Sequence, residues 1–285
     1  MQNQILNQPV RKGLLLMAGP AVIGMLMTFL FQLVDTYFVG KLGTKELAAI
    51  SFSYPVYILV VSLFMGFSAG VSSVVGRALG AQDQVKAKTA STMALVFMML
   101  VTLGLGAIGA STIPQVFGFL GAGPEMLPLV DQYMTPLYWG MVALVGTLIA
   151  NGSLMAKGLM VPATVVMGIG GMVNLVLDYL LIFGVGSIPP LGLLGASYAT
   201  VFSWLVTLIL MLVLLGRHEL ITLKIVARPK ESWGPLQEVL KIGMPAVVAQ
   251  ILNPIAIAAL TRVVSQYLVD QHFQSVKELF SPDTH

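Results

Sequence analysis

Long apolar runs, separated by short polar segments, dominate the pattern of this chain. They cover residues 14 to 39, 47 to 76, 89 to 111, 130 to 153, 160 to 183, 192 to 215 and 239 to 265. A run of about 20 apolar residues crosses a bilayer as an α-helix, whereas a barrel strand has about 10 residues of alternating polarity. Because backbone groups in lipid must be paired within their own segment, the pattern predicts an all-α polytopic membrane protein with about seven transmembrane helices.

Composition supports this prediction and excludes other classes. The chain has 57% apolar and only 9% charged residues, whereas a soluble domain has about 25% charged residues. Its 285 residues include no cysteine, which excludes disulfides and thiolate chemistry from this chain. The basic residues fall in short loops and form no continuous stripe, so we expect a lipid bilayer as partner and no nucleic acid.

The distribution of basic residues predicts an orientation. Counted along successive loops, ten lie on one side of the predicted membrane and two on the other, where Lys41 and Lys45 stand. The ten are Arg11, Lys12, Arg77, Lys86, Lys88, Lys157, Arg217, Lys224, Arg228 and Lys230. Since cytoplasmic loops are enriched in Lys and Arg, we expect a multi-pass protein of the cell inner (plasma) membrane with a cytoplasmic amino terminus.

A short internal repeat indicates the domain organisation. Residues 240 to 248, around Pro245, resemble residues 15 to 23, around Pro20. We therefore divide the chain into a cytoplasmic amino terminus (1–13), a six-helix amino-terminal lobe (14–215), a basic cytoplasmic loop (216–235), the first helix of a second lobe (236–267) and a polar tail (268–285). We interpret the tail as a truncated or frame-shifted end; the alternative is a seven-span protein with a short external tail.

Asp35 and Asp178 are the carboxylates that lie well inside predicted spans. A charge in hydrocarbon costs about 2.5 to 3.5 kcal/mol, which makes such residues functional candidates. Counted back from Gly40 and Gly184 at about 1.5 Å per residue, both lie about 8 to 9 Å below the outer ends of their helices. Asn174 shares the helical face of Asp178, and Thr200 in the next span reaches a comparable depth.

This set of oxygen-bearing side chains indicates ion binding. Two neighbouring buried carboxylates do not both stay ionised cheaply, so the pair either accepts a proton or is neutralised by a cation. Carboxylate, amide and hydroxyl oxygens suit a hard alkali cation such as Na⁺. The alternative is that the polar residues only join helices by hydrogen bonds.

Other residues are weaker candidates. Pro20, inside the first span, predicts a kink that serves either as a hinge or as a static bend. Gln32, Tyr37 and Asn151 either line the same cavity or make packing contacts.

Three motifs together resemble the multidrug and toxic compound extrusion (MATE) family, closest to its DinF-like branch. They are residues 34 to 43 followed by Leu47-Ala48-Ala49, the pair Asn174 and Asp178, and residues 195 to 200. The resemblance implies two six-helix lobes around a cleft, and export of small organic cations or drugs coupled to Na⁺ or H⁺, with no other cofactor. It also implies that Asp35, Asn174, Asp178 and Thr200 form the amino-lobe cation site and that Pro20 bends the first helix. A full cleft would need the second lobe, most of which this chain lacks.

Three rival interpretations stay open. A lipid-linked oligosaccharide flippase of the same superfamily would need a basic cavity, and no Lys or Arg lies deep in the first six spans. A membrane enzyme would need a nucleophile and base or a metal set, which the sequence does not offer, so we predict that the chain is not an enzyme. The third is an inactive transporter fragment.

Overall fold

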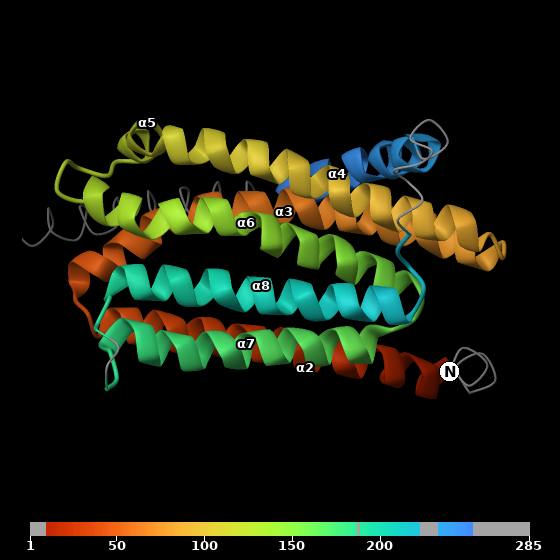
Figure 1. Cartoon of the computed structure of the whole chain (residues 1–285), viewed down its shortest axis with the longest axis horizontal. Helices are drawn as coiled ribbons and strands as arrows, with labels where there is room; N and C mark the ends of the chain where they lie inside the picture. The colour runs from red at the N-terminus through yellow and green to blue at the C-terminus, as the bar shows by residue number, and fades with distance from the viewer. Residues whose placement is uncertain (1–9, 187–188, 223–232, 253–285) are drawn as a thin grey trace, which may run out of the picture.

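The computed structural model describes residues 10–186, 189–222 and 233–252, and these are almost entirely helical (Figure 1). The helices are α2 (Val10–Gly40), α3 (Thr44–Gly80), α4 (Gln84–Ser111), α5 (Ile113–Phe119), α6 (Leu127–Ala156), α7 (Met160–Phe183) and α8 (Leu193–Arg217). Residues 233–252 form a further helical segment. The predicted all-α fold is confirmed.

Five of the described helices, α3, α4, α6, α7 and α8, are long and apolar enough to cross a membrane. The predicted span 160 to 183 has the bounds of α7, and the predicted first span lies inside α2. The predicted span 239 to 265 is described only as far as residue 252, and the polar tail 268–285 lies outside the described residues.

The short helix α5 is a feature that the hydropathy pattern did not predict. It begins with Pro114 in its first turn, where a missing N–H costs nothing. Ile113 and Phe117 are 1% and 0% exposed and anchor the helix against the bundle. A helix of seven residues is shorter than a membrane-spanning run, so the hydropathy pattern does not distinguish it from a loop.

Helix α6 lies at the centre of the bundle, in contact with α3, α4 and α8. Close approach to α3 depends on Gly152, because a Cβ atom there would lie 2.5 Å from the carbonyl oxygen of Ser68. Polar contacts reinforce the packing. Ser68 donates a hydrogen bond to the Leu148 carbonyl (2.7 Å), and the buried Ser91 of α4 donates one to Ser153 (2.8 Å). Small residues and interhelical hydrogen bonds are the usual means of association where lipid removes the hydrophobic drive.

The two ends of the bundle differ in charge. The α3–α4 turn, the α6–α7 turn and the end of α8 lie at one end, which carries Arg77, Lys86, Lys88, Lys157 and Arg217 and is called the basic end below (Figure 1). The α2–α3 turn, with Lys41 and Lys45, lies at the opposite end. This segregation is the one expected if the basic end faces the cytoplasm, which stays a prediction.

Candidate cation and substrate site

A cavity of about 500 Å³ opens among α2, α3, α6, α7 and α8. Most of its wall is apolar or aromatic, with polar groups at a few points. Its lining includes Gln32, Asp35, Tyr54, Tyr57, Tyr133, Asn174, Thr200 and Trp204. Asp35 is the only charged side chain among the described residues that line it. A mostly apolar cavity with few polar groups is the usual form of a small-molecule site.

Asp35 and Asp178 meet at this cavity. Asp35, on α2, is partly exposed and belongs to the lining, whereas Asp178, on α7, is only 1% exposed. The two carboxylates are close enough to interact directly. Within the described chain, one oxygen of each and the amide nitrogen of Asn174 are buried without a hydrogen-bond partner. Because buried polar atoms are normally paired, these three atoms mark a place that suits a bound proton, cation or water.

The donor set fits a small hard ion better than a divalent metal cluster. The unpaired buried atoms belong to the carboxylates of Asp35 and Asp178 and the amide of Asn174, and Thr200 lines the same cavity as Asp35 and Asn174. In the part of the chain that is described, no group of three or more His, Cys, Asp or Glu residues could hold a metal ion. Two carboxylates supply the charge needed to bind one monovalent cation, or to share one proton.

Two glycines on α7 allow the neighbouring helices to approach the site. Gly170 and Gly171 lie one turn before Asn174, which lies one turn before Asp178. A Cβ atom at Gly170 would overlap the Thr207 hydroxyl of α8, and one at Gly171 would overlap the Phe31 ring of α2. The missing side chains therefore bring α2 and α8 close to the helix that carries Asn174 and Asp178.

Sequence reasoning missed the aromatic part of the site. Tyr133, on α6, is 7% exposed, lines the cavity and lies within electrostatic reach of both carboxylates. The rings of Tyr57 and Trp204 stack with centroids 6.4 Å apart and planes 10° apart. Tyr57 and Trp204 lie well inside their predicted spans and are a usable signal, because Tyr and Trp in membrane helices usually lie near the interfaces. Only tertiary structure pairs Tyr57 with Trp204.

The other predicted residues fall in different places. Gln32 lines the cavity one turn before Asp35. Tyr37 is outside the lining and 59% exposed, with the Lys41 ammonium 4.7 Å from its ring centroid. Asn151 is also outside the lining, with its amide nitrogen 3.5 Å from the Met155 sulfur. Pro20 lies within α2, but its side-chain surroundings are outside the described part of the structure.

The model of the MatE family matches residues 20–180, more than half of the chain, and so includes α3 to α6, most of α7 and the part of α2 that carries Asp35. The chain belongs to the MatE family. Members of this family are transporters and not enzymes. The family was predicted from the sequence motifs, and this prediction is confirmed.

Curated relatives of this MatE chain are named for transport, multidrug export or multidrug resistance. A Shewanella oneidensis protein named FAD transporter is 36% identical over 259 residues, covering 90% of this chain and 57% of the relative. A Bacillus subtilis protein named probable multidrug resistance protein YoeA is 26% identical, covering 90% of this chain and 57% of the relative. The multidrug export protein MepA of Staphylococcus saprophyticus is 26% identical, and the match covers 85% of this chain and 53% of the relative. The chain thus spans about half the length of the curated relatives it matches.

Solved structures agree with the MatE fold. An outward-facing multidrug resistance MATE family transporter of the MOP superfamily superposes with a TM-score of 0.80 at 28% identity. The match covers 91% of this chain and 57% of that one. A MOP superfamily transporter from Pyrococcus furiosus, described as having a binding pocket of reverse polarity, gives the same TM-score and identity.

Proposed function

We propose that this chain is the amino-terminal lobe of a cation-coupled exporter, in which Asp35 and Asp178 bind the coupling ion, H⁺ or Na⁺. Asn174 and Thr200 complete the ion site. The observation that carries the proposal is the carboxylate pair at the cavity, with a buried unpaired oxygen on each residue. A pair with unsatisfied atoms in a low-dielectric setting is sensitive to the arrival of a single positive charge.

The ion would act by favouring one arrangement of α2 over another. Without a bound cation or proton, the two carboxylates repel each other, and α2 is pushed away from α7. Ion binding removes the repulsion and draws the helices together. A ligand shifts such an equilibrium only by its difference in affinity for the two arrangements. Pro20, inside α2, supplies a point at which the helix can bend.

An organic cation or a planar aromatic molecule is the substrate class that the cavity favours. Asp35 supplies negative charge, and Tyr54, Tyr57, Tyr133 and Trp204 supply π-faces that attract cations and flat rings. No Lys or Arg lines the described cavity, which disfavours the pyrophosphate of a lipid-linked oligosaccharide here. The multidrug export in the name of MepA and the multidrug resistance in the name of YoeA agree with this class.

A flavin nucleotide is a second candidate substrate. It is favoured by the 36% identical relative named FAD transporter and by the stacked rings of Tyr57 and Trp204, which offer a flat surface to a tricyclic ring. The diphosphate of such a substrate would bind outside this cavity, because the described lining carries no positive charge.

The test is transport by a full-length transporter that carries this chain and a second lobe, in vesicles with separately imposed Na⁺ and pH gradients. We expect Asp35→Asn and Asp178→Asn to abolish efflux of a fluorescent organic cation. The matched control is Asp131→Asn, because Asp131 is exposed and bonded only to Thr135. Efflux that persists in both Asn variants would contradict the proposal. Adding FAD or ethidium as competitor separates the two substrate classes.

A further inference from the structure

The helical segment 233–252 packs against α3 along three glycines. A Cβ atom at Gly66 would lie 2.5 Å from the Cα atom of Val247, and one at Gly70 would lie 2.8 Å from the carbonyl oxygen of Val239. In the other direction, a Cβ atom at Gly243 would lie 2.7 Å from the Phe67 ring. Side chains do not tolerate such distances, so the two helix backbones touch here. We call this contact the glycine seam.

The glycine seam is continuous with the core of the first lobe. Leu236 and Val239 are fully buried, and Val247 is 5% exposed. Val239 and Val247 belong to the same buried cluster as Phe64 and Val71 of α3. The segment that begins the predicted second lobe is therefore packed into the first lobe in the half of the bundle nearest the basic end.

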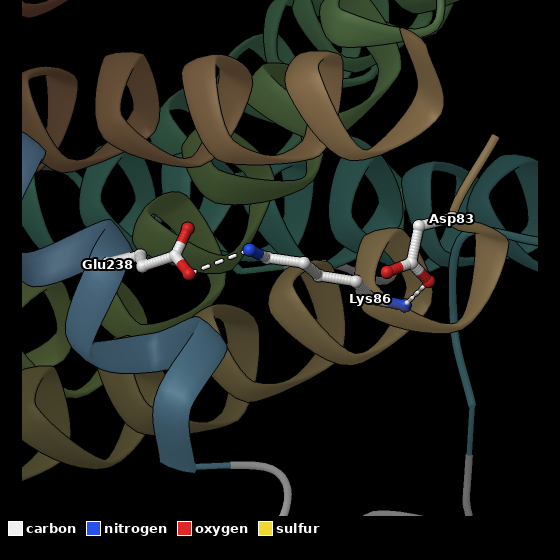
Figure 2. Close-up of polar contacts among 3 residues, drawn as sticks. All are labelled: Asp83, Lys86 and Glu238. Carbon is white, nitrogen blue, oxygen red and sulfur yellow. Dashed lines mark hydrogen bonds and ion pairs between the residues drawn. The ribbon is translucent and has the colours of Figure 1, made fainter. Parts of the chain in front are cut away.

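An ion pair closes the seam at the basic end, as Figure 2 shows. The Nζ atom of Lys86 donates a hydrogen bond to Oε1 of Glu238 at 2.7 Å, with the two side chains 36% and 45% exposed. Lys86 lies in the first turn of α4, and its backbone N–H donates to the Asp83 carboxylate at 2.9 Å. This N-cap fixes the turn from which the Lys86 side chain reaches the segment.

The same end of α4 also holds the chain that leaves α8. Lys88 donates to the Glu219 carboxylate at 2.8 Å, and the backbone N–H of Thr222 donates to the Thr92 hydroxyl at 3.0 Å. Lys88 lowers the pKa of Glu219 by hydrogen bonding and charge. The first turns of α4 thus bind the chain on both sides of residues 223–232.

We propose that the glycine seam and the Lys86–Glu238 pair form a gate that closes the basic end of the transporter between its two lobes. An exporter that loads substrate from that end must part helices of the two lobes there. Close van der Waals packing at small residues holds apolar helices together in lipid, so the seam stabilises the closed state and must separate when the gate opens. The ion pair lies at the partly exposed edge, where it biases the gate toward closure.

The gate is tested without measuring transport in a full-length transporter whose second lobe is made free of cysteine, because this chain contributes no cysteine. Val239→Cys places a buried thiol in the seam, and its reaction rate with a water-soluble maleimide reports opening. We expect Lys86→Glu or Glu238→Lys to raise that rate up to about fivefold, the range of one partly exposed ion pair. The double reversal, Lys86→Glu with Glu238→Lys, should return it to the parent value.

Glycine variants test the seam independently. Gly66→Ala should raise the rate at least as much, because its methyl group would overlap the Val247 backbone. Gly76→Ala is the matched control on the same helix, since its methyl group would meet only the Ala156 Cβ atom at 3.9 Å. Phe119→Cys, at a 92% exposed position in α5, should react equally in every background, and thermal melting in detergent shows that the variants are folded.

Two outcomes overturn the gate. One is an unchanged rate at Val239→Cys in both charge reversals and in Gly66→Ala, which would make the seam a permanent joint. The other is a double reversal as reactive as the single ones. The role of the gate in substrate loading rests on the proposed transport function, whereas the contact that forms the gate does not. Repeating the labelling with Asp35→Asn separates the two, because loss of the ion site should stop efflux and leave the response to Lys86→Glu intact.

Discussion

Asp35 of α2 and Asp178 of α7 interact directly at the cavity wall, and each keeps one buried carboxylate oxygen without a hydrogen-bond partner in the described structure. Binding of an ion to this pair would therefore change the distance between α2 and α7. Trp204 lines the same cavity, so a change at the pair reaches an optical probe without any added label.

Ion binding should change the fluorescence of Trp204. With Trp139 and Trp233, the other two tryptophans, replaced by Phe, we expect Na⁺ or acid to shift the emission, because α2 and α7 change their separation and alter the cavity. Asp178→Asn should abolish the response, and Asp131→Asn should keep it. A response that survives in Asp178→Asn would place the ion elsewhere.

Gly171→Ala should uncouple α2 from α7. Its methyl group would overlap the Phe31 ring, and overpacking of this kind costs about 1 to 3 kcal/mol. We expect reduced thermal stability in detergent and weaker ion binding, since Asp35 moves away from Asp178. Gly168→Ala, three residues earlier on α7, meets nothing within 4 Å and is the control. Equal behaviour of the two variants would contradict the close approach of α2.

Trp204→Ala should weaken binding of flat aromatic substrates by about 2- to 13-fold, the equivalent of one aromatic contact of about 0.5 to 1.5 kcal/mol. The reason is loss of the surface that Trp204 forms with Tyr57. Equilibrium binding of ethidium to the purified transporter measures the effect. Trp139→Ala, at a 51% exposed position outside the cavity lining, should leave binding unchanged.

Ser153→Ala should lower the free energy of unfolding by about 0.6 kcal/mol, the average of interhelical hydrogen bonds in membranes. It removes the buried bond from Ser91 that joins α4 to α6. Denaturant titration in detergent measures the loss. Ser111→Ala is the control, because exposed Ser111 bonds only to the Ile108 carbonyl of its own helix.

Much of the fold could be predicted because lipid imposes strong local rules. Residues 160 to 183 were predicted as a span and form α7, since an apolar run in a bilayer satisfies its backbone only as a helix. Helix α5 could not be predicted in this way, because its burial depends on Ile113 and Phe117 meeting α6 and its neighbours.

Two properties made part of the candidate site predictable: the energetic cost of a charge in a membrane span and the depth of each residue along its helix. A carboxylate in a membrane span is expensive wherever it points, so Asp35 and Asp178 stood out, and counting residues placed them at one level. Gln32, Tyr37 and Asn151 carry no such cost, and their neighbours depend on how each helix is rotated. The structure places Gln32 in the cavity lining and the other two outside it.

Sequence was therefore sufficient for the helical class, the approximate spans, the family and the carboxylate pair. The family follows from local motifs, and the other three follow from the free-energy cost of placing polar groups in hydrocarbon. Tertiary structure was needed for the aromatic wall of Tyr57, Tyr133 and Trp204 and for the seam at Gly66, Gly70 and Gly243. These features depend on the rotation and spacing of helices distant in sequence, which van der Waals packing at individual glycines decides and hydropathy does not record.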